Sequence, residues 1–241
     1  MSDVLADPIR NRTVIITGAS SGVGKATVET LVARGAHVVA VARSARSAYL
    51  QNRVGNLVVE EADVRDREAM EGVVNRAVGQ FGSCDAIVCN AGVGEYADFL
   101  DMSPESVCEI IGTNLLGTIW SIRAALPHML SVGRGDVIVV SSVVAVVDSA
   151  GEAVYAATKA AQKSLAGCLD LEVRHRGIRV STLLPGGIRT QFAMGRGRAP
   201  DSPELDTMLD PHEVASAVVT LLSQPSHMRT TVWGFSHLYE D

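Results

Sequence analysis

The sequence has few aromatic residues and no excess of basic charge. Phe, Trp and Tyr make up only 4% of the 241 residues, so we expect a core of Ala, Val, Leu and Ile. The 27 acidic side chains outnumber the 21 basic ones, and the resulting charge of −6 argues against a nucleic-acid or anionic-membrane partner. A composition of 47% hydrophobic and 20% charged residues is typical of a globular protein and excludes general disorder.

Long hydrophobic runs and metal-binding motifs are also missing. The longest apolar stretch, residues 137–147, is interrupted by Ser141 and Ser142 and is shorter than the ~20 residues that a membrane span needs. The first 12 residues lack the pattern of a secretory signal. The four cysteines form no CxxC pair, and the six histidines form no HExxH motif. We therefore expect a cytoplasmic protein with reduced, buried thiols and no metal site.

Short β-branched runs alternate with longer helical patterns along the chain. Near-continuously apolar strands separated by helices are typical of a parallel sheet covered on both faces. The sequence therefore predicts an α/β fold, a Rossmann-type doubly wound parallel sheet in a single domain over residues 1–241. The expected strands are residues 13–17, 37–42, 57–62, 85–89, 136–142 and 178–184, with a last strand and a tail in 230–241. The expected helices include residues 23–33, 115–130 and 154–176.

Residues 193–211 do not follow this alternation, because they are polar and rich in Gly and Pro. The segment is too long for an ordinary connection and follows a strand whose carboxyl end should face the ligand. We interpret residues 191–211 as a substrate loop that closes over the site as a lid.

A glycine-rich segment, TGASSGVG, separates the first strand from the first helix. Glycines at such a turn let a pyrophosphate approach the amides of the helix N-terminus. The spacing is TGxxxGxG rather than the usual GxGxxG dinucleotide motif. The residues that we expect to hold the cofactor here are Gly18, Ser20, Ser21, Gly22, Val23 and Gly24.

The end of the second strand indicates which dinucleotide is bound. An NAD site carries an acidic residue there, which accepts the ribose hydroxyls. This chain has Ala42 and Arg43 instead, with Arg46 close behind. A guanidinium pairs with a 2′-phosphate, so the pattern favours NADP(H) over NAD(H).

Tyr155 and Lys159 are four residues apart on an expected helix and therefore share one face. A nearby ammonium group favours the phenolate and lowers the tyrosine pKa, which would make Tyr155 a usable acid–base group. Ser142 closes the preceding strand, where it can meet the same oxygen atom. It lacks the GxSxG context of an acyl nucleophile, so we interpret it as a hydrogen-bond donor to a carbonyl.

These motifs together resemble the classical short-chain dehydrogenase/reductase (SDR) family over about residues 11–222. Four elements match in order: TGASSGVG, CNAG at residues 89–92, Ser142 with YAATK, and PGGIRT at residues 185–190. The resemblance implies that Tyr155 transfers the proton, Lys159 binds the nicotinamide ribose, Ser142 orients the carbonyl and Asn114 holds a water. The further cofactor contacts that it implies are Asp63, Val64, Asn90, Ala91, Gly92, Pro185, Gly186, Ile188 and Thr190.

One residue and one segment depart from the family pattern. Cys89 replaces the first asparagine of NNAG, and residues 230–237 replace a glycine-rich C-terminal motif. The family pattern also implies a homodimer or homotetramer formed through the helices at 115–130 and 154–176.

The function expected from the sequence is reduction of a ketone or aldehyde by NADPH, or the reverse oxidation of an alcohol. The alternative is a cofactor-binding redox sensor or scaffold that catalyses nothing. The expected substrate pocket comprises residues 93–96, 143–147, 151–154 and the loop after Thr190. It is mostly apolar, with one carboxylate from Glu95 or Glu152.

Overall fold

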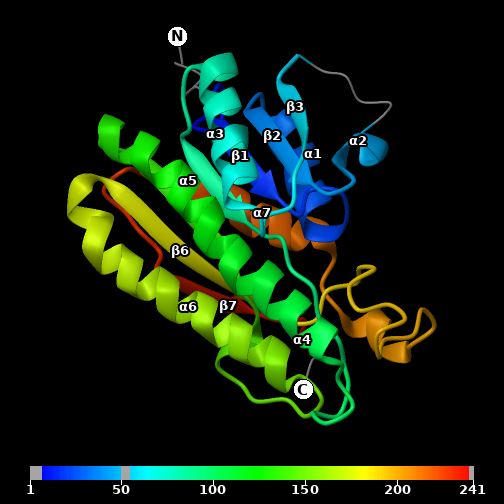
Figure 1. Ribbon diagram of the computed structural model, residues 1–241. Coiled ribbons are helices and arrows are strands. Elements are labelled where there is room, and N and C mark those ends of the chain that lie inside the picture. The colour runs from blue at the N-terminus through cyan, green and yellow to red at the C-terminus, as the bar shows by residue number, and fades with distance from the viewer. Residues whose placement is uncertain (1–6, 50–54, 239–241) are drawn as a thin grey trace.

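A sheet of seven parallel strands forms the centre of the part of the chain that the computed structural model describes, residues 7–49 and 55–238 (Figure 1). The strand order is β3-β2-β1-β4-β5-β6-β7. The strands are β1 (Thr13–Thr17), β2 (His37–Ala42), β3 (Leu57–Glu61), β4 (Ala86–Cys89), β5 (Gly135–Val140), β6 (Ile178–Pro185) and β7 (Val232–Phe235). The bounds of β1 to β6 differ from those of the expected strands by at most two residues, and β7 lies in the segment where the last strand was expected. The predicted fold class is confirmed.

Helices connect the strands and cover both faces of the sheet. They are α1 (Gly22–Ala33), α2 (Ala45–Ala48), α3 (Arg67–Phe81), α4 (Pro104–Ile111), α5 (Gly117–Val132), α6 (Ala153–Val173) and α7 (Pro211–Leu222). Side-chain caps begin several of them: Asp66 accepts from the amide of Ala69, and Asp210 with Glu213 forms a capping box.

Two helical segments differ from their expected bounds. The helix expected over 154–176 is α6 followed by a short 3₁₀ turn, η3 (Arg174–Arg176). The helix expected from residue 115 begins instead at Gly117, because residues before it form a π-helical turn, η1 (Gly112–Leu116). Such turns are frequent at functional sites, and this one contains Asn114.

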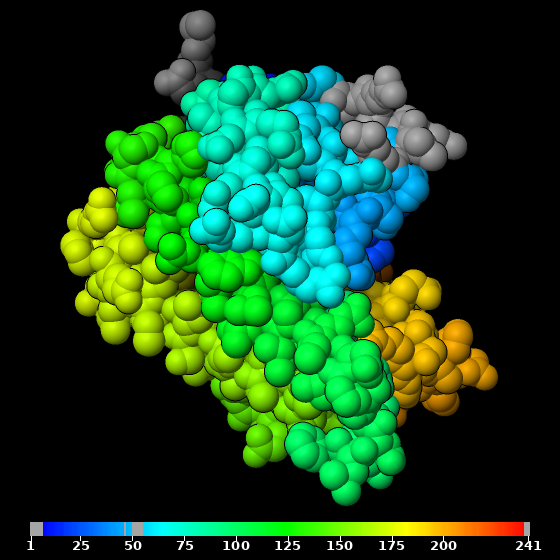
Figure 2. Space-filling view, in the orientation of Figure 1, coloured from blue at the N-terminus to red at the C-terminus, as the bar shows by residue number. Residues whose placement is uncertain are grey.

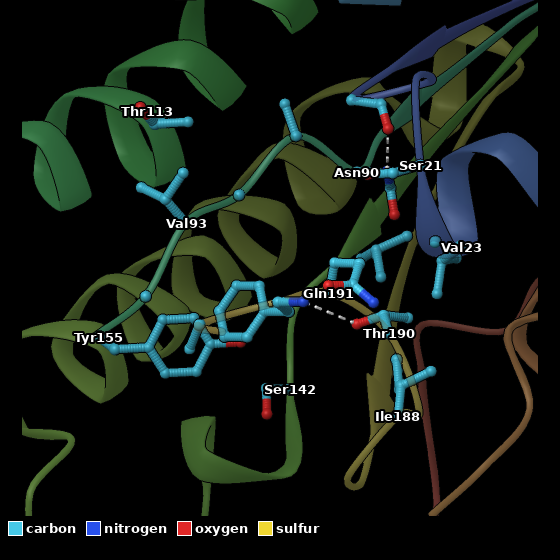
Figure 3. A pocket seen from close by; sticks show the side chains of 18 of the residues that line it. Ser21, Val23, Asn90, Val93, Thr113, Ser142, Tyr155, Ile188, Thr190 and Gln191 are labelled. Atoms are coloured by element: carbon cyan, nitrogen blue, oxygen red, sulfur yellow. Dashed lines mark hydrogen bonds between the residues drawn. The ribbon is translucent and has the colours of Figure 1, made fainter. Parts of the chain in front are cut away.

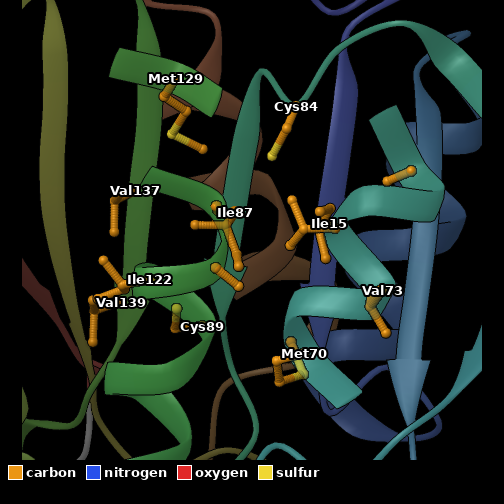
Figure 4. Packing of buried hydrophobic residues seen from close by; sticks show 14 of the residues in the cluster. Ile15, Met70, Val73, Cys84, Ile87, Cys89, Ile122, Met129, Val137 and Val139 are labelled. Atoms are coloured by element: carbon orange, nitrogen blue, oxygen red, sulfur yellow. The ribbon is translucent and has the colours of Figure 1, made fainter. Parts of the chain in front are cut away.

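Two apolar layers sandwich the sheet, because successive side chains of a strand point to opposite faces. Ile15 packs with α3, α5 and α6 on one face, in a cluster that includes Met70, Ile122 and Met129 (Figure 4). Its neighbours Val14 and Ile16 pack against α1 and α7 on the other face. Aliphatic side chains dominate both layers, as the scarcity of aromatic residues predicted.

The sheet has its topological switch point between β1 and β4, since β1 pairs with β2 on one side and β4 on the other. Chains leaving these strands diverge to opposite faces, and ligands bind at the carboxyl ends there. Three elements meet at this edge: the glycine loop after β1, residues 90–94 after β4, and η2 (Val143–Ala145) after β5.

The four cysteines are free thiols, but only two of them match the expected burial. Cys84 and Cys89 are buried, whereas Cys108 on α4 and Cys168 on α6 are exposed. The expectation of four buried thiols is wrong for these two, because each lies on the outward side of an amphipathic helix. None of the described helices combines the length and apolarity that crossing a membrane requires.

Candidate active site

A cavity of about 640 Å³ runs along the carboxyl ends of the strands at the switch point. Figure 2 shows its surface as a notch between the blue-to-cyan N-terminal part and the orange loop around residue 200. Figure 3 shows Tyr155 and Ser142 on one side of the cavity and Ser21 and Val23 on the other. Both ends therefore belong to one continuous space of a size typical for ligand sites.

The glycine loop forms one end of this cavity. Gly18 and Gly22 have φ angles of +66° and +50°, a backbone region that side-chain-bearing residues rarely adopt. A Cβ on Gly24 would lie 2.2 Å from the carbonyl oxygen of Gly18, so this packing also requires glycine. The N-terminus of α1 carries no acidic side chain in its first turn and leaves its dipole and free amides available to an anion.

Asn90 fastens the glycine loop to the end of β4. Its side-chain amide donates to the carbonyl oxygens of Thr17 at 3.0 Å and Gly18 at 3.3 Å. The hydroxyl oxygen of Thr17 accepts in return from the backbone amides of Asn90 and Ala91, both at 3.1 Å. Cys89, which replaces an asparagine of the family pattern, is buried within the sheet and does not line the cavity.

Arg43 lines the cavity beyond the glycine loop, and its side chain is 58% exposed. Asp63 and Val64 line the cavity near it. The guanidinium of Arg65 forms a bidentate pair with Asp63, with contacts of 2.6 to 3.0 Å, and holds the pKa of that carboxyl below its usual value. The side chain of Arg46 lies outside the described part of the structure.

Tyr155, Lys159 and Ser142 lie together at the other end of the cavity. The N-terminal turns of α6 carry Tyr155 and Lys159, and Ser142 lies just past the end of β5. The Lys159 Nζ atom is 5.5 Å from the centre of the Tyr155 ring and donates to the carbonyl oxygen of Val140 at 3.0 Å. The i, i+4 relation that the sequence indicated therefore produces the expected common face.

The electrostatics of this group differ from the expectation. Burial raises the pKa of Tyr155 above its ordinary value, and its hydrogen bond with Ser142 opposes this change. Burial also lowers the pKa of Lys159 to about 7. Burial disfavours the charged form of Lys159, and a lysine without its charge has less effect on the pKa of a neighbouring phenol.

Asn114 is fully buried in η1 and does not line the cavity. Its side-chain amide exchanges two hydrogen bonds with the backbone of Val93, at 2.8 and 2.9 Å. The backbone carbonyl oxygen of Asn114 accepts hydrogen bonds from the side chains of Gln162 at 2.8 Å and Thr118 at 2.7 Å. Asn114 therefore holds the backbone of Val93, next to Gly92, where a Cβ would lie 3.7 Å from Lys159 Nζ.

Residues of the segment 191–211 line the cavity next to Tyr155. The ring of Phe192 lies 5.4 Å from that of Tyr155, and a Cβ on Gly94 would come within 2.5 Å of the Phe192 ring. Of the two candidate carboxylates, Glu152 lines the cavity, and burial raises its pKa. Glu95 instead accepts from Arg196 and Ser106 and is not part of the lining.

Of the catalytic and cofactor-binding residues expected from the sequence, all but Gly24, Asn114 and Pro185 line the cavity. The expected substrate pocket, residues 93–96, 143–147 and 151–154, is only partly correct, since the members that line the cavity are Val93, Gly94, Tyr96, Val143, Val144 and Glu152. Gly24 packs against Gly18 and Asn114 bonds to Val93, and both Gly18 and Val93 line the cavity. Pro185 is the last residue of β6. Some lining residues were not expected, and they adjoin expected ones in sequence. They are Ala42, Ser44, Ala62, Thr113, Val140, Ser141 and Gly187.

Comparison with known proteins agrees with this fold and cavity. The family model for short chain dehydrogenases matches residues 12–201. Oxidoreductase UcpA of Salmonella typhimurium is 33% identical, over 92% of this chain and 91% of that protein. L-rhamnose 1-dehydrogenase (NAD(P)(+)) of Azotobacter vinelandii is 34% identical, over 88% of this chain and 90% of that protein.

A solved structure of a similar protein extends the comparison. The alcohol dehydrogenase of the archaeon Thermococcus sibiricus, complexed with 5-hydroxy-NADP, superposes with a TM-score of 0.84 at 28% identity. The alignment covers 95% of this chain and 98% of that one. The fold is thus a Rossmann-type oxidoreductase fold. The chain belongs to the short-chain dehydrogenase/reductase family, as its motifs indicated.

Proposed function

We propose that the protein interconverts a ketone or aldehyde and its alcohol with NADP(H). The observation that carries this proposal is that Tyr155, Ser142 and Lys159 line one end of a cavity whose other end is the glycine loop. A hydroxyl pair next to a dinucleotide-sized cleft is what carbonyl reduction needs. Among the described residues no histidine lines this cavity, so acyl transfer by a nucleophile–histidine pair fits it less well.

The residues of the cavity fit a nicotinamide dinucleotide. The bare backbone at Gly18 and Gly22 and the N-terminus of α1 would hold the pyrophosphate, and residues 90–92 with Ile188 and Thr190 would flank the remainder. When bound, the nicotinamide supplies or accepts the hydride. Residues of the protein then bind the oxygen atom of the substrate by hydrogen bonds and transfer the proton to or from it.

Tyr155 is the proton donor in the direction of reduction. Its phenol transfers a proton to the carbonyl oxygen as that oxygen gains negative charge, while the Ser142 hydroxyl donates a second hydrogen bond to it. Lys159 would bind the ribose and bring a positive charge close to the phenol. Burial lowers the pKa of Lys159 to about 7, and a hydrogen-bond acceptor placed beside its Nζ atom would favour the charged form.

The alternative of a silent cofactor-binding protein has less support. A protein that only binds the dinucleotide has no need for Tyr155 and Ser142 on the cavity wall next to Lys159. The Phe192 ring also adds an apolar wall beside Tyr155 at this end of the cavity.

NADP(H) is the proposed cofactor because of Arg43. It lines the cavity at the end of β2, where Ala42 occupies the position of the acidic residue of an NAD site. The names of the similar proteins include both cofactors, so the preference rests on this chain's residues.

A carbonyl panel tests the proposal directly. Purified protein is assayed with NADPH and with NADH against apolar ketones, aldehydes and polar sugar-like carbonyls, and the alcohol formed is quantified. We expect turnover of at least one class, with one alcohol formed per NADPH consumed. Tight cofactor binding without turnover of any member would instead support the silent alternative.

We also propose a homodimer or homotetramer. Apolar side chains are exposed around α5 and α6, including Leu116 at 43% and Leu171 at 59%. Such positions commonly mark protein–protein contacts. Light scattering should give two or four times the 25.4 kDa of one chain, and a monomer at micromolar concentration would contradict the proposal.

A further inference from the structure

One carboxylate on α4 binds two arginines that line different parts of the cavity. Glu109 Oε1 lies 3.6 Å from Arg43 Nη1, at the end of β2. Its other oxygen, Oε2, lies 3.1 Å from Arg196 Nη1, on the substrate loop after β6. The two arginines come from opposite sides of the switch point, and both line the cavity, whereas Glu109 does not.

Arg196 is well anchored even without Glu109. Its Nη2 and Nε atoms donate to Glu95 at 3.0 and 3.1 Å, and its carbonyl oxygen accepts from the amide of Tyr96 at 2.9 Å. Arg43 is held less firmly, because the one ion pair that the described structure gives it is the 3.6 Å pair with Glu109, although its charge also acts on Asp63. The neighbouring Arg65 is already paired in bidentate geometry with Asp63.

We propose that Glu109 determines the strength of the preference for NADP(H), because it competes with the 2′-phosphate for Arg43. This inference rests on the proposed cofactor and assigns a role to a residue outside the cavity. For the 2′-phosphate to pair with Arg43, the ion pair between Arg43 and Glu109 must break. NAD(H) carries no such phosphate and leaves this ion pair intact. Glu109 thus acts on NADP(H) through Arg43, as a positioning residue.

Arg196 moderates this competition. Two cations share the two oxygens of one carboxylate, so each reduces the hold of Glu109 on the other. Without Arg196, Glu109 would pair with Arg43 alone and hold it more firmly against the phosphate. Changes at Glu109 and at Arg196 therefore shift the cofactor preference in opposite directions, although both residues belong to the same ion-pair chain.

The test is the ratio of the dissociation constants for NADH and NADPH, measured by fluorescence at fixed salt concentration. Glu109→Gln should raise this ratio in favour of NADPH about two- to fivefold, which is the range for a partly exposed ion pair. Arg196→Gln should lower it by up to about twofold. The ratio cancels effects on the fold or on loop closure that both cofactors share.

Two controls separate competition for Arg43 from simple charge removal. Glu105 is exposed one turn earlier on α4, so Glu105→Gln removes the same charge nearby and should leave the ratio unchanged. In the Arg43→Gln background, Glu109→Gln should have no effect on the ratio. If Glu109→Gln raised the ratio equally in that background, Glu109 would be repelling the phosphate directly, and the inference would be overturned.

The outcomes also separate this inference from the proposed cofactor. If Arg43→Gln leaves NADPH affinity unchanged, the NADP(H) assignment is wrong and the inference fails with it. If Arg43→Gln weakens NADPH binding but Glu109→Gln does not change the ratio, only the inference is overturned.

Discussion

Tyr155→Phe should reduce kcat for carbonyl reduction by about 10²–10⁴-fold while leaving cofactor affinity within twofold of the wild type. The phenylalanine ring preserves the packing against Phe192, 5.4 Å away, so the wall of the cavity is kept. What is lost is the proton that the substrate oxygen must receive. Ser142 cannot replace it, because an aliphatic hydroxyl is too weak an acid near neutral pH.

Two other variants serve as controls for this result. Tyr96 is a second phenol in the same cavity, so Tyr96→Phe removes the same group and should change kcat by only a few-fold. Lys159→Ala should reduce both kcat and cofactor affinity, because the ammonium serves both the ribose and the phenol. Turnover of Tyr155→Phe within threefold of the wild type would show that another group donates the proton.

Ala42→Asp combined with Arg43→Gln should invert the cofactor preference. We expect the wild type to bind NADPH about 10- to 150-fold more tightly than NADH, from the ~1.5–3 kcal/mol of a charge-assisted pair. The 2′-phosphate carries close to two negative charges near neutral pH. In the variant the new carboxylate accepts the ribose hydroxyls and repels this phosphate, so NADH should bind more tightly.

A nearby arginine provides the matched control for this inversion. Arg65 already pairs with Asp63, so Arg65→Gln removes an equal charge without removing the proposed phosphate partner and should preserve the order of affinities. Titration of both cofactors by fluorescence at one salt concentration measures the order. Tighter binding of NADH by the wild-type protein would refute the assignment of Arg43 and leave the proposed carbonyl chemistry standing.

Local patterns in the sequence predict the fold and the outline of the site well. The apolar runs around Ile15 and Val39 are buried on both sides, as the central strands of a parallel sheet must be. The glycines at 18, 22 and 24 meet steric demands that the backbone imposes. The common face of Tyr155 and Lys159 follows from helical periodicity, because four residues make about one turn, whereas their catalytic roles were implied by the family resemblance.

Features that depend on contacts between distant segments could not be predicted in this way. The ion pairs of Glu109 join residues that are 66 and 87 positions apart in sequence, and no local motif indicates them. The π-helical turn that directs Asn114 toward Val93 depends on tertiary packing. The pKa changes of Tyr155 and Lys159 arise from burial, which is a property of the folded chain.

The bonds that Asn90 makes to Thr17 and Gly18 have a consequence for the energetics of cofactor binding. They hold the phosphate-binding loop in its turn within the protein alone, so the conformational entropy of ordering this loop is lost during folding. Association then uses a preorganised surface and retains more of its interaction free energy as affinity. Because of the hydrogen bonds of Asn90, the free-energy cost of ordering this loop lowers the stability of the folded protein and does not lower the affinity for the cofactor.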